Sequence, residues 1–201
     1  MSNGQEYDLI IKNVRLVRPN HSDVPTSDIA IKDGKFAAIG PVLDAASAGE
    51  VIEGHGLLAF PGLVDAHMHV VIYQPLDQDA ITESKSAPMG GVTSALTYIR
   101  TGAYYLNRGG PYAEFMPEVQ CLSAGNYWVD YGYHVAPINR AHIDEMPALM
   151  TEHGVSSYKI FMFYGGHGLN RASSAQRDFL HISDNENYEF DHYKYNINKI
   201  K

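Results

Sequence analysis

The first sixty residues carry short runs in which apolar and polar side chains partly alternate, a pattern that predicts β-strands. Residues 7–19 have the β-branched content of a strand, and a strand punctuated by glycine follows over residues 50–60. Between them, residues 27–40 hold two apolar runs around an Asp-Gly dipeptide at Asp33, which accepts the positive φ values of a tight hairpin turn. We therefore expect residues 1–60 to form a small antiparallel β layer, part of a β-sandwich, with a structural role.

From residue 61 onward, apolar strand-like runs alternate with helix-like segments. The strand-like runs are residues 63–69, 92–99, 128–136 and 155–164. The helix-like segments are residues 79–89, 111–123 and 144–153. Such alternation indicates βαβ units and a parallel sheet. Four of these units are half of an eight-stranded barrel, so the predicted fold class is α/β: the β layer, then the first half of a TIM-like (β/α)8 barrel over residues 61–201.

Proline and glycine positions set the expected ends of the helices. Asp79 is a possible N-cap of the first helix, and two glycines after Met89 stop it. Pro117 interrupts the second helix. Pro147 is tolerated in the third helix because it falls in the first turn, and Gly154 follows its last residue.

A half barrel leaves open strand edges and an exposed apolar face. An eight-stranded barrel typically needs ~250 residues on its own. We therefore interpret the chain as a fragment, a truncated product or a chain whose end was altered. The tail, residues 183–201, is rich in Asn, Asp, Tyr and Lys, and could form a surface helix or a frayed end.

Two histidines stand at the end of the first predicted barrel strand, in the segment FPGLVDAHMHV. Side chains two apart on a strand share one face, so His67 and His69 present two imidazoles side by side. Neutral imidazole is a common ligand of zinc. We favour a metal site over two structural histidines because the pair follows a Pro-Gly turn and an apolar strand. Asp65, one strand step earlier, could orient a ligand or be a capped polar residue.

Lys159 lies in the middle of the apolar run YKIFMFY, where a charged side chain is costly unless it is paired or chemically changed. Three interpretations compete. The lysine could reach out of a strand end, it could be a buried nucleophile with a lowered pKa, or carbon dioxide could convert it into a carbamate. The last would turn a cation into an anionic oxygen donor that can bridge two metals. On position alone we favour the first.

Composition narrows the classes of function. The 201 residues are 45% hydrophobic and 19% charged, as in an ordinary globular protein. A net charge of -8 gives no electrostatic support to nucleic-acid binding. A lone cysteine, Cys121, rules out an intramolecular disulfide framework and a Cys-rich zinc site, and we expect it to be buried. No apolar run approaches the ~20 residues of a membrane span and the start lacks a secretory signal, so a cytoplasmic protein is expected.

Five segments, in this order, resemble the amidohydrolase superfamily, and most closely its cyclic-amidohydrolase branch, the hydantoinases and dihydropyrimidinases. They are YDLIIKNVRLV, DIAIKDGKFAAIG, PGLVDAHMH, GGVTSALTYI and GVSSYKIFMFY. The resemblance runs from about Tyr7 to Tyr164. Its more specific parts are PGLVDAHMH and SSYKIFMFY at their relative positions.

The resemblance implies roles for particular residues. His67 and His69 would bind the more buried metal. Lys159 would be carboxylated by CO2 and would bridge two divalent metals, usually zinc. Tyr164 would hydrogen-bond the substrate carbonyl. The family's two later histidine ligands and its catalytic aspartate lie on barrel strands five, six and eight, and this chain ends before them.

Other candidates are given supporting roles. We interpret His134 as a residue of the barrel interior that supports the ligands rather than as a ligand itself. Tyr73 and Leu76 could line a substrate pocket, as lid loops of the family do, or could belong to a surface loop. Three further histidines are not in contexts that match the family: His167, His181 and His192.

The reaction that the resemblance implies is hydrolysis of a cyclic amide or imide, such as a 5-substituted hydantoin or a dihydropyrimidine. Allantoin and dihydroorotate are more distant candidates. The family is mostly tetrameric, so a homo-oligomer is expected. The alternative is an inactive fragment or a non-catalytic assembly or interaction module of the same fold. Such relatives typically lose the metal ligands, whereas His67, His69 and Lys159 are present here.

Overall fold

A computed structural model describes residues 5–71, 74–101, 110–137, 140–160 and 198. The chain divides into two compact units, Met1–Pro61 and Gly62–Lys201. Each unit has its own sheet and its own buried core. Within the described ranges, none of the helices has both the length and the apolar character that a membrane crossing requires.

The first unit is a five-stranded mixed sheet. Its strands are β1 (Tyr7–Leu16), β2 (Thr26–Lys32), β3 (Lys35–Gly40), β4 (Ala48–Glu53) and β5 (Leu58–Ala59), with a short 3-10 helix η1 (Ala45–Ser47). β1, β2 and β3 pair antiparallel, as predicted. β4 and β5, however, run parallel to β1, so the expected purely antiparallel layer is wrong in this detail. The reason is the connection: the chain leaves β3 through a loop and η1 rather than a tight turn, and only a tight turn enforces an antiparallel return.

The predicted hairpin between β2 and β3 is confirmed. Asp33 and Gly34 take φ values of 51° and 71°, the left-handed conformation that a two-residue hairpin turn requires.

Near the other end of β2, Asp28 is 3% exposed, and its carboxylate accepts the backbone N–H of Asn13 at 2.8 Å and that of Leu43 at 2.9 Å. Asn13 lies at an irregularity of β1 with φ 52°, so Asp28 satisfies an amide that leaves the strand ladder.

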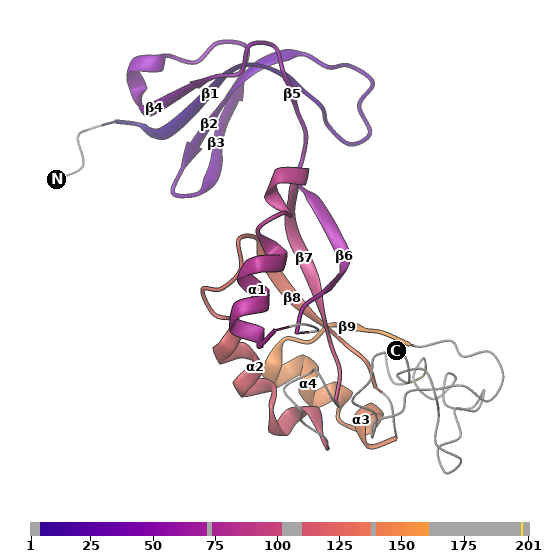
Figure 1. Ribbon diagram of the computed structural model, residues 1–201. Helices are drawn as coiled ribbons and strands as arrows, with labels where there is room; N and C mark the ends of the chain where they lie inside the picture. The colour runs from indigo at the N-terminus through magenta and orange to yellow at the C-terminus, as the bar shows by residue number, and fades with distance from the viewer. Residues whose placement is uncertain (1–4, 72–73, 102–109, 138–139, 161–197, 199–201) are drawn as a thin grey trace. The chain divides into compact units, whose positions relative to one another are not determined.

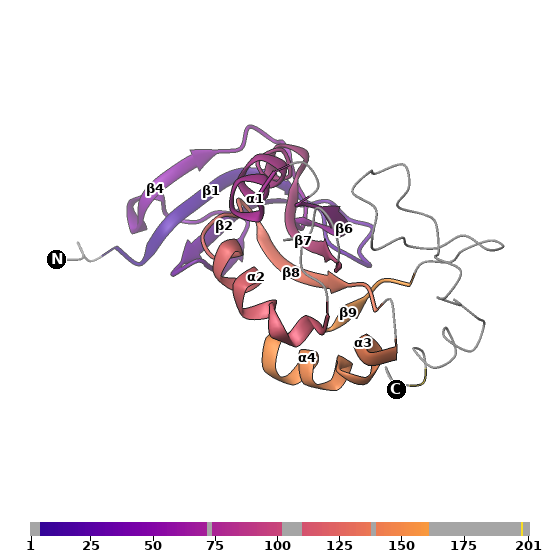
Figure 2. The same cartoon turned by 60° about the horizontal axis from the view of Figure 1, so that its bottom comes forward.

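The second unit contains a parallel sheet in the order β6-β7-β8-β9, which is also the order along the chain. The strands are β6 (Leu63–His69), β7 (Val92–Ile99), β8 (Asp130–Val135) and β9 (Ser157–Tyr158). The helices are α1 (Leu76–Ser84), α2 (Met116–Ser123), α3 (Arg140–Asp144) and α4 (Met146–His153), with 3-10 helices η2 (Pro88–Gly90) and η3 (Tyr112–Glu114). Figures 1 and 2 show α1, α2 and α4 along one face of this sheet. The α/β class and the half-barrel arrangement are therefore confirmed.

Side chains from the helices, the strands and the segments between them build the core of this unit. The buried members come from α1, α2, α4 and the strands and include Leu76, Ala80, Met116, Val119, Tyr133, Val135 and Leu149. Gly62, just before β6, packs against β7 so closely that a Cβ there would overlap the Thr93 side chain. The helices pack closely on the strands, and the chain before β6 packs closely on β7. These contacts hold β6, the strand that carries the histidines, in place.

Two predicted helix boundaries are corrected. α1 begins at Leu76, after Pro75, and Asp79 is a 1% exposed residue inside the helix rather than its cap. Leu76 itself is fully buried in the core, because Leu76 and Ala80 are four positions apart and face the sheet together. Neither the pocket-lining position nor the surface loop considered for Leu76 is observed.

The segment expected as one helix over residues 144–153 is the end of α3 followed by α4. Pro147 cannot donate to the carbonyl four residues earlier, which ends α3, but it is tolerated in the first turn of α4 as predicted. Glu145, at the junction, turns its carboxylate to the backbone N–H groups of Tyr112 and Ala113, at 2.8 and 3.0 Å. Similarly, Pro117 lies in the first turn of α2 and does not interrupt it.

Cys121 is exposed, so the expectation that it is buried is wrong. α2 buries Met116, Val119 and Ser123, a stripe at helical spacing that faces the sheet. Position 121 lies off that stripe. The exposed thiol has no structural role in the core.

Candidate metal centre

The two histidines of β6 lie side by side, as their spacing predicts. The Nε2 atoms of His67 and His69 are 2.9 Å apart, and the ring centroids are separated by 4.7 Å at an interplanar angle of 87°. Which nitrogen donates depends on the tautomer, but one of the two must carry the shared proton. The pair therefore presents two imidazole nitrogens to one point at the carboxyl end of β6.

Lys159 joins this pair from the far side of the sheet. Its backbone N–H donates to the carbonyl of Val135 at 2.8 Å, which continues the pairing of β9 with β8. Its Nζ atom lies 3.0 Å from Nε2 of His67. The side chain is part-buried, and the residue directly follows Tyr158, the last residue of β9. Three nitrogens, two from β6 and one from the residue after β9, thus converge.

His134 borders the same cluster from β8. Its ring lies 5.2 Å from that of His67, edge to face, and its Nδ1 atom is 2.6 Å from Oγ of Ser157. Ser157 is the first residue of β9, two positions before Lys159. The structure therefore places His134 beside the ligand candidates, with one ring nitrogen within hydrogen-bonding distance of a hydroxyl, and its supporting role stays a prediction.

Asp65 turns to the backbone. Its Oδ1 atom accepts the backbone N–H of His67 at 3.0 Å, which is a capping interaction within β6. The same carboxylate opposes the other influences on the His67 pKa by favouring the charged ring. Asp65 thus contacts the backbone of His67 and not its ring. Its predicted role in orienting a metal ligand stays a prediction.

The electrostatics of the cluster keep its rings neutral. Partial removal of each ring from water, reinforced by the repulsion of any positive charge on His67 or Lys159, lowers the pKa of both His69 and His134 to about 4. Burial and then Lys159 also lower the pKa of His67, and burial lowers that of Lys159. A neutral imidazole has a free nitrogen lone pair, and metal binding requires that form.

The donor set fits a divalent metal ion. Two nitrogens on one tetrahedral zinc, each at about 2.0–2.1 Å, are about 3.3 Å apart, close to the observed Nε2–Nε2 separation of 2.9 Å. Over the ranges that the structure describes, no three His, Cys, Asp or Glu side chains gather closely enough to hold a metal by themselves. The described part of the site consists of His67, His69 and Lys159.

Several predicted residues cannot be compared with the structure. Tyr164, expected at the substrate carbonyl, and Tyr73, expected to line the pocket, lie outside the described residues. The histidines set aside in the loops and tail also lie outside them: His167, His181 and His192. Their roles stay predictions.

Tyr98 is the residue of this site that the sequence analysis did not single out. It is fully buried on β7, with its ring 5.5 Å from the ring of His67 and 4.9 Å from that of His69. The one signal in the sequence is its place in the strand next to the histidines. Even so, only the register, which pairs Tyr98 with His69 and with His134, shows that it faces the same side.

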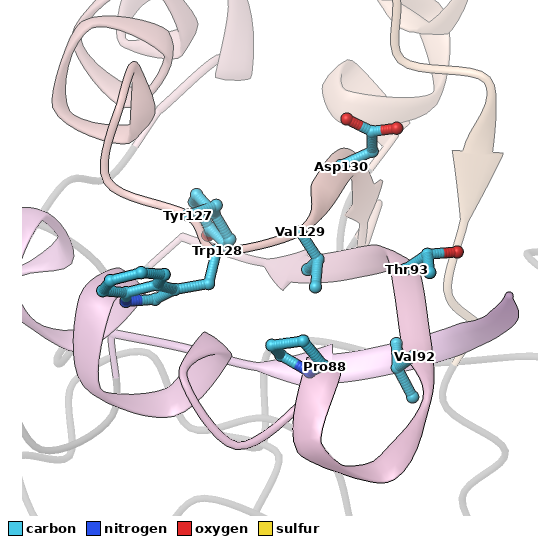
Figure 3. Close-up of a pocket in the computed structure, with 7 residues that line it drawn as sticks. All are labelled: Pro88, Val92, Thr93, Tyr127, Trp128, Val129 and Asp130. Atoms are coloured by element: carbon cyan, nitrogen blue, oxygen red, sulfur yellow. The ribbon is translucent and has the colours of Figure 1, made fainter. Parts of the chain in front are cut away.

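A pocket at the other end of the sheet does not compete for this role (Figure 3). It lies at the amino ends of β7 and β8 and is lined by Pro88, Val92, Thr93, Tyr127, Trp128, Val129 and Asp130. A single carboxylate and no imidazole line it. Barrel enzymes carry their active sites at the carboxyl ends of the strands, where the histidines lie.

Known proteins resemble this chain along most of its length. No protein-family model matches it. It is 31% identical over 160 residues to a D-hydantoinase from Geobacillus stearothermophilus, a match that covers 77% of this chain and 32% of the relative. It is 31% identical over 160 residues to an allantoinase from Bacillus velezensis, covering 76% of this chain and 35% of the relative.

A solved structure shows the same likeness in three dimensions. The L-hydantoinase (dihydropyrimidinase) from Arthrobacter aurescens matches with a TM-score of 0.64 at 26% identity, over 90% of this chain and 36% of that chain. The chain thus spans about a third of the length of the curated relatives it matches. These relatives confirm the resemblance found in the motifs. The chain belongs to the amidohydrolase superfamily, in its cyclic-amidohydrolase branch.

Proposed function

We propose that the protein is a metal-dependent hydrolase that opens the ring of a cyclic amide by cleaving a C–N bond, with hydantoins and dihydropyrimidines as its substrates. One observation carries the proposal. Lys159 and His67 are 92 positions apart in the chain, yet their side-chain nitrogens lie 3.0 Å apart beside a second imidazole. The relatives named hydantoinase, dihydropyrimidinase and allantoinase support the choice of substrate class.

His67 and His69 would hold a divalent ion, for which zinc is the first choice because imidazole suits it. A bound metal would supply Lewis acidity, polarising the substrate carbonyl and lowering the pKa of water. The chain's own contribution is to present both imidazoles in the neutral form and at the right spacing, since burial lowers the pKa of each.

Lys159 would carry a carbamate derived from CO2 and would bridge two such ions. In this step the neutral amine forms a bond from Nζ to the carbon of CO2 and loses one proton, which leaves an anionic carboxylate. Part-burial lowers the pKa of Lys159 and so enlarges the neutral fraction that can react. An anionic oxygen donor would also replace the positive charge that Lys159 otherwise places next to His67.

The remaining parts of the proposal concern residues and properties beyond the described site. Tyr164 would donate a hydrogen bond to the substrate carbonyl oxygen, where negative charge develops. Tyr73 would line the substrate pocket. A homotetramer is carried over from the family, and a cytoplasmic location stays the expectation from the sequence.

The test is a ring-opening assay on the protein supplied with zinc, using hydantoin, dihydrouracil and allantoin and detecting the acyclic product. We expect turnover of at least one substrate, its loss on chelation, and its loss in His67→Ala and Lys159→Ala. His21→Ala is the matched control, because His21 is a half-exposed histidine of the first unit. Absence of ring opening with all three substrates, or full activity in Lys159→Ala, would overturn the proposal.

A non-catalytic relative of the same fold is the second candidate. The observation that favours it is the short donor set, since the described ranges supply no group of three His, Cys, Asp or Glu side chains. A protein of this kind would show no turnover and no zinc after purification without chelators. Stoichiometric zinc measured by elemental analysis would exclude it.

A further inference from the structure

The inner face of the sheet carries a row of rings at one level. The register pairs His69 of β6 with Tyr98 of β7, and Tyr98 with His134 of β8. Tyr98 thus lies between His69 and His134, because β7 is the strand between β6 and β8. It is fully buried, whereas His67 is half-buried and His69 is exposed. The tyrosine ring is the rigid part of this face, and the imidazoles pack on it.

One ring contacts all three nitrogen-bearing side chains of the candidate site. The Tyr98 ring is 4.9 Å from the His69 ring at 50° and 5.5 Å from the His67 ring at 47°. Nζ of Lys159 lies 5.2 Å from its centroid, within the range in which an aromatic face attracts a cation. A flat surface that touches two rings and an ammonium group restricts the rotamers of all three.

Metal-binding histidines are usually oriented by a carboxylate or a carbonyl that accepts the proton of the second ring nitrogen. Among the residues that the structure describes, the side-chain hydrogen bonds of these two rings run only between the rings and to Lys159. The nearest carboxylate, Asp65, accepts the backbone N–H of His67 and leaves the ring alone. Ring packing therefore takes the place of that hydrogen bond in this part of the site.

We propose that Tyr98 is a positioning residue: its ring holds His67, His69 and Lys159 in a convergent arrangement before any metal binds. The proposal rests on the metal site of the proposed function and adds a residue that acts through the ligands. The ring carries this role, so a phenylalanine would preserve it and an aliphatic side chain would not.

The test compares divalent metal binding in the wild-type chain, Tyr98→Phe and Tyr98→Leu, using cobalt(II) as a spectroscopic probe and zinc in competition. We expect Tyr98→Phe to keep the wild-type cobalt spectrum and affinity. We expect Tyr98→Leu to bind about 10- to 100-fold more weakly, the usual cost of losing a residue that orients a metal ligand, with an altered spectrum. Equal affinity and an equal spectrum in Tyr98→Leu would overturn the proposal.

Tyr133→Leu is the matched control. Tyr133 is a buried tyrosine of the neighbouring strand β8, and its position next to His134 in the strand places it on the opposite face, in the hydrophobic core. It should lose stability like Tyr98→Leu but keep the metal affinity. Equal loss of affinity in both variants would assign the effect to general destabilisation and overturn the proposal.

A measurement on the unsubstituted chain covers the case in which Tyr98→Leu does not fold. Nuclear Overhauser effects in the metal-free protein should connect the Tyr98 ring with both histidine rings. Their absence would overturn the proposal. Failure of the wild-type chain to bind cobalt or zinc, with these contacts present, would instead count against the metal site of the proposed function.

Discussion

The Nζ atom of Lys159 lies 3.0 Å from the Nε2 atom of His67, at opposite edges of a four-stranded parallel sheet. A curled sheet brings its edges toward one another on the inner face, so side chains from β6 and from the residue after β9 can meet there. This contact joins the predicted histidine pair to the predicted lysine. It turns two separate motifs into one candidate site.

The first prediction concerns metal stoichiometry. Among the residues that the structure describes, two histidines and one lysine carbamate are too few ligands to close two zinc sites, since structural and catalytic zinc sites take about three or four protein ligands each. We expect this donor set to hold one zinc ion and a second only weakly, so ring opening should need zinc well above the protein concentration. Isothermal titration with zinc measures this, and two tightly bound ions per chain would contradict it.

The second prediction concerns Asp28 in the first unit. Its two carboxylate oxygens each accept one backbone N–H, from Asn13 and from Leu43. Asp28→Asn replaces one acceptor by a donor that faces an N–H, so we expect a loss of about 1–3 kcal/mol in the free energy of unfolding. Urea unfolding of the full chain followed by circular dichroism measures it. Asp23→Asn, at an exposed ion pair with Arg18, is the control and should change stability far less.

The third prediction concerns the pH dependence of the same carboxylate. Burial raises the pKa of Asp28, but the hydrogen bonds from Leu43 and Asn13, together with Lys12, outweigh it and leave the pKa lowered. A carboxylate with a lowered folded-state pKa stabilises the fold above the unfolded-state pKa and loses that effect as pH falls through the folded-state value. The stability difference between wild type and Asp28→Asn should therefore be full near neutral pH and shrink under acid conditions. A difference that grows as pH falls would refute this assignment.

The fourth prediction concerns Glu145, which links α4 to η3. Its carboxylate accepts the backbone N–H groups of Tyr112 and Ala113, and Glu145→Ala leaves both without this acceptor. We expect a loss of about 1–3 kcal/mol in the free energy of unfolding, measured by urea denaturation with tryptophan fluorescence. Glu152→Ala, an exposed glutamate on α4, should be close to neutral. Equal stability of the two variants would show that the Glu145 hydrogen bonds contribute nothing net.

The fifth prediction concerns the packing of the chain before β6 against β7. A Cβ at Gly62 would overlap the side chain of Thr93, including its own Cβ, so Gly62→Ala must shift the backbone. Overpacking of this kind costs about 1–3 kcal/mol, which thermal unfolding would detect. Gly90→Ala is the control because a Cβ at Gly90 meets nothing within 4 Å. A wild-type melting temperature in Gly62→Ala would mean that the contact is easily relieved.

Much of the local structure follows from the sequence because short-range geometry decides it. The Asp-Gly turn at Asp33, the strand over Val92–Ile99 and the place of Pro147 in the first turn of a helix all agree with the predictions. In each case a residue's own φ restriction or a two-residue alternation is sufficient. Boundaries that depend on partners were wrong, as for α1, which starts at Leu76 because its side chain packs in the core.

The sequence likewise predicted some features of the candidate site and not others. The spacing of His67 and His69 by itself placed both imidazoles on one face, since side chains two apart on a strand point the same way. The resemblance to cyclic amidohydrolases also came from the motifs alone. The sequence could not show how Lys159 would be solvated, and its position alone favoured a strand-end lysine.

Only the tertiary structure decided which side chains meet. The parallel return of β4, the contact of Lys159 with His67, and the place of Tyr98 beneath all three nitrogens depend on strand register and sheet curvature. A shift of one residue in register would turn Tyr98 to the opposite face of the sheet. Register is set by the packing of the whole unit, and no local pattern in the chain contains it.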